Sequence, residues 1–283
     1  MLDLSKKYLV TGGSGFLGIE LIKRLTEMGC KNIVSVSRNE GKSVQLKELF
    51  PHVDIILGDI KDPYICHKSC QDVSGVYDLS AFKHVGLAEK ENVKECVQTN
   101  VVGTINLLEE ARKNNLDFII GISSDKAAQV KGVYGATKFI MERLFLEYSA
   151  LNTKTKFRIV RYGNVAWSTG SVLCKWKEKM LKGEEVIITD RDATRFFWTV
   201  DSAVDLIFEC LDKSVSSYPY LTKMKSIQMG DLLDAMMDKY GRVSVKTIGM
   251  QVGENLHESM DDSGGLDSYN AERYTKEEIL QLI

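Results

Sequence analysis

The sequence predicts an α/β fold, in which a doubly wound parallel sheet is joined to a smaller carboxy-terminal lobe. Short apolar runs alternate with longer amphipathic stretches over residues 1–165. This rhythm is typical of repeated βαβ units, whose strands are parallel and whose helices cover both faces of the sheet. The three prolines, Pro51, Pro63 and Pro219, fall between periodic segments or at their starts. After about Asn164 the rhythm weakens, which predicts the second lobe.

Each expected element follows from its own apolar periodicity. Runs of strand length stand at Tyr8–Val10, Ile33–Val36, Val53–Leu57, Val76–Leu79, Phe118–Ile122 and Phe157–Val160. Helical spacing is present at Phe16–Met28, Asn92–Asn114, Gly135–Ala150, Ser202–Leu211 and Met229–Tyr240. The stretch Asp261–Ile283 is polar and then helical. We therefore expect a sheet domain over residues 1–165 and a smaller lobe over residues 166–283, with parts of the two interleaved.

Composition and charge exclude several classes of protein. Charged residues make up 27% of the chain and the formal net charge is −2, so no nucleic-acid partner is expected. No apolar run approaches the roughly 20 residues that cross a bilayer, and no signal peptide precedes the first strand, so we expect no membrane partner and a cytoplasmic location. Cys66 and Cys70 flank His67 without a further ligand at metal-site spacing. Reduced thiols and no metal site are therefore expected.

A glycine-rich turn between the first strand and the first helix is the strongest local motif. Gly13, Gly15 and Gly18 fit the G-x-G-x-x-G pattern of Rossmann-type folds, and Gly12 with the last two also fits G-x-x-G-x-x-G. Glycine lets the backbone turn tightly and approach a pyrophosphate, while the helix N-terminus supplies free N–H groups. The turn therefore predicts a bound dinucleotide, contacted by Gly12, Gly13, Ser14, Gly15, Phe16, Leu17 and Gly18.

The end of the second strand indicates which dinucleotide is bound. Ser37 and Arg38 stand where an NAD site usually has an acidic residue for the ribose 2′-hydroxyl. A hydroxyl and a guanidinium suit the 2′-phosphate of NADP, which arginine can bind with two hydrogen bonds. NADP is therefore the expected cofactor, with NAD and a solvated Arg38 as the alternative. Asp59 and Ile60 follow the third strand, where the adenine edge would lie.

Tyr134 and Lys138 form the expected catalytic pair. They are four residues apart at the start of a helix, so their side chains project from one face. An ammonium below a phenol lowers the phenol pKa and makes the phenolate available near neutral pH. The pair follows the fifth strand and a polar cluster of Ser124, Asp125 and Lys126. This context predicts redox chemistry on a substrate hydroxyl.

The chain resembles the extended short-chain dehydrogenase/reductase family over nearly its whole length. The resemblance rests on the segments 11–18, 81–89, 99–104, 123–127, 134–138, 160–165, 170–172, 188–196 and 253–258. Within that family it resembles the UDP-N-acetylglucosamine 4,6-dehydratases of polysaccharide biosynthesis, which carry Asp-Lys where dTDP-glucose dehydratases carry Asp-Glu. Asp125 and Lys126 match that pair. Tyr134 resembles the relatives that invert C5, because several C5-retaining relatives carry methionine there.

The resemblance implies a lyase that oxidises C4 of the sugar, removes water across C5–C6 and returns the hydride to C6. Tyr134 would take the O4 proton, its pKa lowered by Lys138, while Ser124 bonds O4. Lys126 would abstract the C5 proton, and we expect nearby Lys138 and partial burial to lower its pKa. Asp125, protonated in an apolar pocket, would give its proton to the 6-hydroxyl.

The resemblance also implies binding residues and partners. Cofactor contacts are expected from Ala81, Lys83, Tyr134 and Lys138 in addition to the glycine turn. Substrate contacts are expected from Lys83, Asn100, Ser124, Tyr134, Asn164, Arg195 and Glu254. The implied partners are a UDP-sugar and further copies of the chain in a homo-oligomer. Departures from the family pattern at Thr169, Cys174 and Gln251 lie in the sugar-binding lobe, so they bear on which UDP-sugar is used.

Two alternatives stay open from the sequence. A UDP-sugar 4-epimerase or 4-keto reductase would share the fold and the tyrosine–lysine pair but would not need Asp125 and Lys126 as acid and base. A non-catalytic NADP-sensing protein would need neither pair. For single residues, Asn100 could instead brace the adjoining helix through a backbone hydrogen bond.

Overall fold

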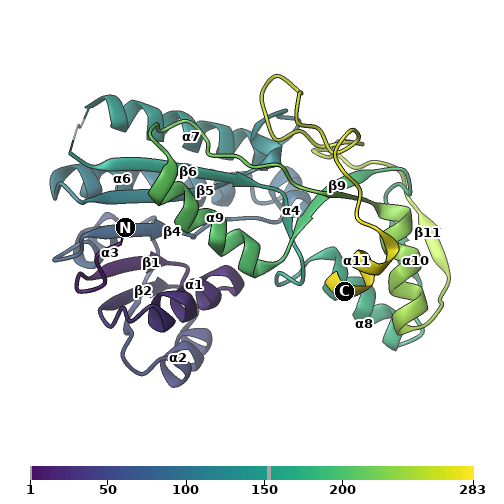
Figure 1. Cartoon of the computed structure of the whole chain (residues 1–283), viewed down its shortest axis with the longest axis horizontal. Coiled ribbons are helices and arrows are strands. Elements are labelled where there is room, and N and C mark those ends of the chain that lie inside the picture. Colours follow the sequence, from purple (N-terminus) through teal and green to yellow (C-terminus); the bar gives the residue numbers. More distant parts are fainter. Residues whose placement is uncertain (1, 152–153) are drawn as a thin grey trace.

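Six parallel strands form the main sheet of the computed structural model, which describes residues 2–151 and 154–283 (Figure 1). Their order across the sheet is β3-β2-β1-β4-β5-β6. The strands are β1 (Tyr8–Thr11), β2 (Ile33–Ser37), β3 (Asp54–Leu57), β4 (Gly75–Asp78), β5 (Phe118–Ser124) and β6 (Lys156–Tyr162). All six apolar runs are strands, so the predicted doubly wound parallel sheet is confirmed. β1 and β4 are buried throughout, as expected for strands covered on both faces.

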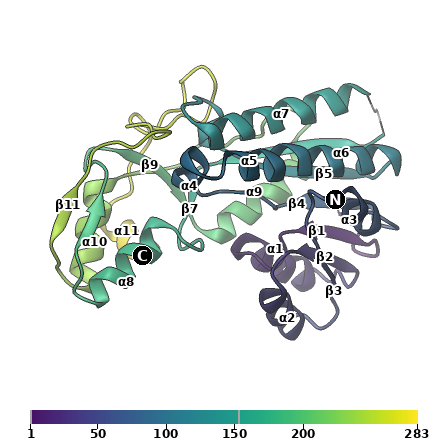
Figure 2. The ribbon, with the colours of Figure 1, turned by 180° about the vertical axis from the view of Figure 1, so that it is seen from behind.

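Helices cover both faces of this sheet (Figures 1 and 2). One face carries α1 (Phe16–Glu27), α2 (Glu40–Leu49) and α9 (Val200–Lys213), and the other carries α3 (Pro63–Ser69), α6 (Thr104–Lys113) and α7 (Val133–Leu151). The α9 helix comes from the second half of the sequence, yet it packs on α1 and β6. Residues of the predicted smaller lobe therefore complete one layer of the sheet domain.

The stretch predicted as one helix over Asn92–Asn114 is interrupted. It begins as α5 (Val93–Val97), widens into the π-helical turn η1 (Gln98–Gly103) and continues as α6. The Asn100 side chain bonds both backbone groups of Phe82, accepting from its N–H at 2.7 Å and donating to its carbonyl at 3.0 Å. Such π-turns often occur at functional sites, and this one fixes the segment that follows β4.

The remaining elements build a smaller lobe at the carboxyl end of the sheet, on the right of Figure 1. Within the described part of the chain this lobe has the sheet β10-β9-β7 and the strand pair β11-β8. Its strands are β7 (Asn164–Val165), β8 (Val186–Ile188), β9 (Thr194–Trp198), β10 (Ser226–Gln228) and β11 (Val245–Thr247). Its helices are α8 (Val172–Leu181), α10 (Met229–Tyr240) and α11 (Lys276–Leu282). Buried Trp176, Phe197 and Leu233 belong to its separate core.

The two cysteines that are close in the sequence, Cys66 and Cys70, lie inside the sheet domain as free thiols. Cys66 and Cys70 are fully buried at α3, among apolar side chains of α6 and β4. The Cys66 thiol donates to the Ile60 carbonyl at 3.1 Å, and burial raises the pKa of Cys70 to about 12. Both thiols therefore stay protonated and act as packing groups.

A buried ion pair joins the helix layer to the last strand of the sheet. Arg161 of β6 and Glu142 of α7 are each only 2% exposed, with 2.5 Å between Nη2 and Oε2. Ser123 also donates to Glu142, and Arg161 donates to the Met260 carbonyl at 2.8 Å and to Asp262 at 2.9 Å. Arg161 therefore anchors the loop around Met260 to the sheet.

We predict that Arg161→Met destabilises the fold by about 3–5 kcal/mol, because it leaves the Glu142 carboxylate buried without a charged partner. Urea denaturation followed by circular dichroism measures the loss. The control is Lys182→Ala, which removes an exposed pair with Glu178 and should change stability by less than about 1 kcal/mol. Equal effects of the two substitutions would contradict this assignment.

Candidate active site

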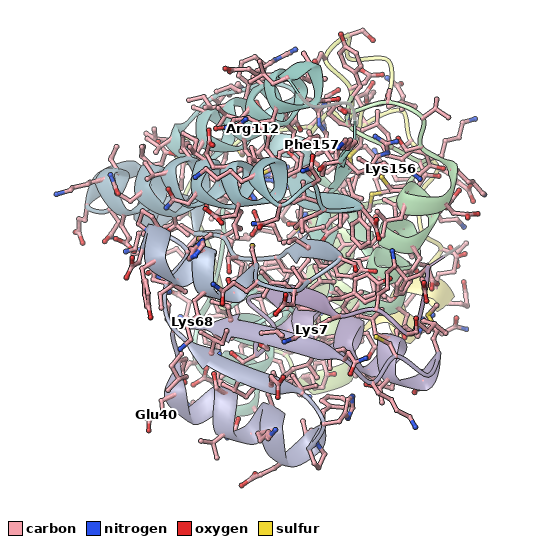
Figure 3. The ribbon with its side chains drawn as sticks, turned by 90° about the vertical axis from the view of Figure 1, so that its left-hand side faces the viewer. Lys7, Glu40, Lys68, Arg112, Lys156 and Phe157 are labelled. Carbon is pink, nitrogen blue, oxygen red and sulfur yellow. The ribbon has the colours of Figure 1, made fainter. Side chains whose placement is uncertain are left out.

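The direction in which successive strands are added reverses between β1 and β4. Strands β2 and β3 lie on one side of β1, whereas β4, β5 and β6 lie on the other. Ligands of open α/β sheets bind beyond the carboxyl ends of the strands at such a switch point. A cavity of about 870 Å³ lies there, between the sheet and the smaller lobe. Figure 3 shows the opposite end of the strands, where Lys7 and Lys156 mark the amino ends of β1 and β6. The cavity is therefore on the far side of that view.

The glycine turn packs too closely against neighbouring backbone to accept larger residues. Gly12 has a φ of +66°, and a Cβ there would lie 3.2 Å from the Leu79 carbonyl carbon. A Cβ on Gly18 would lie 2.6 Å from the Gly13 Cα, so only glycine lets α1 begin so near the turn. The Ser14 N–H donates to Ser37 Oγ at 3.2 Å, which joins the turn to the end of β2.

Most of the predicted cofactor residues line one continuous part of the cavity. These are Gly12, Ser14, Gly15, Phe16, Leu17, Gly18, Ser37, Arg38, Asp59, Ile60, Ala81 and Lys83. Gly13 does not line it; a Cβ there would meet the Ser35 hydroxyl and lie 3.0 Å from Ile22 Cδ1, so this glycine serves helix packing. The turn, the N-terminus of α1 and the polar end of β2 together fit a dinucleotide.

Arg38 is already engaged by carboxylates. Its Nη1 lies 3.4 Å from Asp59 and 3.2 Å from Glu95, and its side chain is half exposed. Lys61 contacts the same two carboxylates, with 2.8 Å to Glu95. A phosphate at this end of the cavity would therefore compete with Asp59 and Glu95 for the guanidinium.

The predicted polar cluster lies where β5 ends. Ser124 is the last residue of β5, and Asp125 and Lys126 open the short 3₁₀ turn η2 (Asp125–Ala127). Ser124 Oγ donates to Asp125 Oδ1 at 2.8 Å, and Lys126 Nζ donates to the same oxygen at 3.1 Å. Glu258 approaches from the smaller lobe, with 3.3 Å between its Oε1 and Lys126 Nζ. Asp125, Lys126 and Tyr134 all line the cavity.

Burial gives Asp125 the character of an acid. It is only 1% exposed, and among the described residues its Oδ2 has no hydrogen-bond partner. Burial and the Glu258 charge raise the pKa of the Asp125 carboxyl, although Lys126 opposes them. The raised carboxyl pKa expected from the sequence is therefore confirmed, and the free oxygen can bond a substrate group.

We expected the pKa of Lys126 to be lowered, and this prediction is wrong. Burial does disfavour its ammonium, but the charges of Asp125 and Glu258 outweigh that effect and raise the pKa of Lys126. Glu258 is distant along the chain, so the sequence indicated only Lys138 as a charge near Lys126. In this structure Lys126 is a paired cation.

The expected lowering of the Tyr134 pKa by Lys138 is also not found. Burial raises the pKa of Tyr134 to about 12, opposed mainly by the charge of Lys126. Lys138 instead donates to the Ile122 carbonyl at 2.6 Å, and burial lowers its own pKa. Tyr134 and Lys138 do share the cavity face of α7, as their spacing predicts.

The other residues predicted to contact the nucleotide-sugar substrate divide into two groups. Lys83, Asn164, Arg195 and Glu254 line the cavity. Asn164 donates to the Phe196 carbonyl at 3.1 Å. Asn100 does not line the cavity and bonds Phe82 and Thr137 instead, which matches the bracing alternative.

Glu258 and Thr99 are two of the cavity residues that were not predicted. Glu258 is 1% exposed and contacts Lys126; its signal was its place at the end of the family-like segment 253–258. Thr99 lies on the π-turn, is 3% exposed, and among the described residues its hydroxyl has no hydrogen-bond partner. The signal for Thr99 was its place at the start of the family-like segment 99–104, but the π-turn on which it lies was not predicted.

Taken together, the glycine turn, the switch-point cavity and the Tyr134–Lys138 pair define an extended short-chain dehydrogenase/reductase. The model of the family described as "Polysaccharide biosynthesis protein" matches residues 8–279. The chain belongs to this family, and it is an enzyme of the nucleotide-sugar dehydratase and epimerase group. No helix in the described residues is long and apolar enough to span a membrane.

Curated relatives cover most of the chain. An uncharacterized membrane protein of Methanocaldococcus jannaschii is 35% identical over 90% of this chain and 80% of its own length. A UDP-N-acetylglucosamine 4,6-dehydratase (inverting) of Campylobacter jejuni is 34% identical over 91% of this chain and 79% of its own length.

Solved structures share the whole fold. Pen from Bacillus thuringiensis has a TM-score of 0.94 at 26% identity, covering 100% of this chain and 98% of its own. The dTDP-glucose 4,6-dehydratase DesIV from Streptomyces venezuelae, solved with NAD and TYD bound, has a TM-score of 0.83 at 18% identity, covering 98% and 95%. The likeness to DesIV shows that the sheet and smaller lobe form one conserved architecture.

We predict that Lys126→Met makes stability strongly pH-dependent. Without the ammonium, Asp125 and Glu258 are like charges in a buried site, so the already raised pKa of Asp125 rises further. A group whose pKa is higher in the folded than in the unfolded state loses its stabilising contribution as pH rises. The variant should therefore be about 3–5 kcal/mol less stable than wild type near pH 8 and close to it near pH 4.

Urea denaturation at both pH values measures this difference. Lys131→Met, which removes an exposed lysine five residues further on, is the control and should behave as wild type at both. A loss of stability in Lys126→Met that is the same at both pH values would contradict the charge argument.

Proposed function

We propose that this protein is a UDP-N-acetylglucosamine 4,6-dehydratase that inverts C5, producing a UDP-2-acetamido-2,6-dideoxy-hexos-4-ulose. The buried Asp125–Lys126 pair beside Tyr134 carries the proposal. An epimerase or a simple reductase moves hydride at C4 and needs no acid and base for C5 and C6. The 34% identical relative from Campylobacter jejuni bears the name of this activity.

The proposed cofactor is NADP, with NAD as the alternative. When bound, the nicotinamide would accept a hydride from C4 and return it to C6, so no net oxidation occurs. The glycine turn would hold the pyrophosphate and Lys138 the ribose beside it. The structural neighbour DesIV was solved with NAD, which supports a nicotinamide cofactor without deciding between the two.

The side chains of this chain would handle the protons. Tyr134, as the phenolate, would take the O4 proton while Ser124 bonds O4, and cationic Lys138 would stabilise the phenolate. The ketone at C4 acidifies the C5 proton, which Lys126 would abstract. Asp125, with its raised pKa and free oxygen, would give a proton to the leaving 6-hydroxyl.

The 3.1 Å contact between Lys126 Nζ and Asp125 Oδ1 provides a route to reset the pair. After elimination, Lys126 carries the proton from C5 and Asp125 is ionised. Transfer of that proton from Lys126 to Asp125 would restore a neutral base and a protonated acid without exchange with water. The O4 proton held by Tyr134 would then pass to C5 from the other face of the sugar, which would give the inverted product and restore the phenolate.

The smaller lobe would hold the nucleotide. Residues 1–165 are proposed as the cofactor and catalytic domain, and residues 166–283 as the UDP-sugar lobe. Asn164 and Arg195 are proposed at the diphosphate, with Lys83 and Glu254 near the sugar or ribose. The expected homo-oligomer and cytoplasmic location stay predictions.

The deciding experiment is incubation with UDP-N-acetylglucosamine in heavy water, followed by NMR of the product. We expect loss of water and deuterium at C5 with inverted configuration. Asp125→Asn should slow the loss of water by at least about 100-fold, because it removes a general acid. Asp231→Asn, on an exposed position of α10, should keep wild-type turnover. Full turnover by Asp125→Asn would favour the epimerase or reductase alternative.

Tyr134→Phe separates an enzyme from a non-catalytic NADP sensor. The phenylalanine keeps the ring but removes the hydroxyl, so we expect cofactor binding to persist while turnover falls by about 100-fold or more. Calorimetry with NADP and the NMR assay measure the two properties. Unchanged turnover in this variant would overturn the assignment of Tyr134.

Arg38→Ala tests the choice of cofactor. If Arg38 binds the 2′-phosphate, the variant should lose about 10- to 100-fold in NADP affinity, since a hydrogen bond to a charged group contributes about 1.5–3 kcal/mol. NAD affinity should stay the same. Arg242→Ala, which removes an exposed arginine of the smaller lobe, is the charge-matched control. Equal losses for NADP and NAD would show that Arg38 does not read the 2′-phosphate.

A further inference from the structure

A buried carboxylate connects the two lobes at the active site. Glu258 is 1% exposed, and its Oε1 faces Lys126 Nζ at 3.3 Å and Arg195 Nε at 3.8 Å. Neither approach is aligned as a hydrogen bond, and among the described residues Oε1 has no hydrogen-bond partner. The carboxylate therefore acts on both cations through charge.

The backbone and the other oxygen of Glu258 are firmly held. Oε2 accepts from Asn255 Nδ2 at 3.1 Å, and the Glu258 N–H donates to Ser268 Oγ at 2.8 Å. Ser268 Oγ in turn donates to the Thr194 carbonyl at 3.1 Å, next to Arg195 on β9. These contacts prevent the carboxylate from moving away from Lys126 without breaking the loop.

The charges around Lys126 can be counted. Asp125 faces it from η2, Glu258 and Arg195 face it from the smaller lobe, and Tyr134 faces it from α7. Two carboxylates and two cations leave the cluster neutral when Asp125 is ionised. When Asp125 is protonated, as the proposed acid must be, Glu258 is the one carboxylate still paired with Lys126.

We propose that Glu258 is a positioning residue that holds the Lys126 ammonium against Asp125 and sets the pH above which Lys126 becomes available as a base. The inference rests on the proposed role of Lys126 at C5. It follows that, below that pH, Glu258 keeps the proton on Lys126 even when Asp125 is protonated, and that neutral Lys126 beside protonated Asp125 is reached only above it. Arg195 shares the carboxylate and limits how strongly it acts on Lys126.

An opposite charge within about 4–6 Å shifts the pKa of a titratable group by roughly 1–3 units. Replacing Glu258 by glutamine keeps the shape and removes the charge, so the pKa of Lys126 should fall by that amount. The fraction of neutral amine at a fixed pH below that pKa then rises at least about tenfold. Glu258→Asp keeps the charge and shortens the side chain.

The test is trace labelling with acetic anhydride, which acetylates neutral amines, followed by peptide mass spectrometry over a range of pH. Lys131, exposed and close in sequence, is the internal reference in the same protein. We expect Lys126 to react at least about tenfold faster in Glu258→Gln than in wild type, relative to Lys131. Glu272→Gln removes an exposed charge of the smaller lobe, 73% accessible, and should leave the Lys126 rate unchanged.

An unchanged rate in Glu258→Gln would overturn the proposal. An equal increase in Glu258→Gln and Glu258→Asp would also overturn it, because greater access rather than lost charge would then be the cause. Circular dichroism confirms that each variant is folded before labelling. The labelling uses no substrate, so its outcome is independent of whether the protein dehydrates UDP-N-acetylglucosamine.

The pH profile of turnover adds a second readout. If Lys126 must be neutral to act, the rising limb of kcat in Glu258→Gln should move to lower pH by about 1–3 units. A merely structural role would lower kcat by the same factor at every pH. A limb that stays in place while Lys126 labelling accelerates would show that Glu258 controls the lysine but that Lys126 is not the base.

Discussion

The ion pair between Asp125 and Lys126 is the constraint on which the rest of this site depends. Both side chains are withdrawn from water where β5 ends, and isolated charges are expensive to bury. The pair therefore needs further partners, and the smaller lobe supplies them as Glu258 and Arg195. A charge cluster with members from both lobes can be complete only when the lobes are packed together.

A second buried ion pair supports the first. Arg161 of β6 pairs with Glu142 of α7, and it also donates hydrogen bonds to the carbonyl of Met260 and the carboxylate of Asp262. These residues follow Glu258 within a few positions along the same loop. The sheet domain thus holds the loop that delivers Glu258 to Lys126, and the stability of the fold is linked to the electrostatics of the site.

Sequence reasoning was most successful where the physics is local. Strand and helix periods, the glycine turn and the Tyr134–Lys138 spacing each depend on neighbours a few residues away, and the structure has them, except that a π-turn interrupts the helix predicted over Asn92–Asn114. It was least successful for protonation. Burial raises the pKa of Tyr134, whereas the charges of Asp125 and of Glu258, which comes from a distant segment, raise the pKa of Lys126 against the effect of burial.

The sequence by itself determined the parallel sheet, the turn that begins α1 and the succession of Asp125, Lys126 and Tyr134 after β5. Only the tertiary structure decided that α9 returns to cover the sheet, that a π-turn places Asn100 against Phe82, and that Glu258 lies 3.3 Å from Lys126. The reason is physical. Periodicity and turn chemistry act over a few residues, whereas charge interactions and burial depend on which distant segments pack together in a region that excludes water.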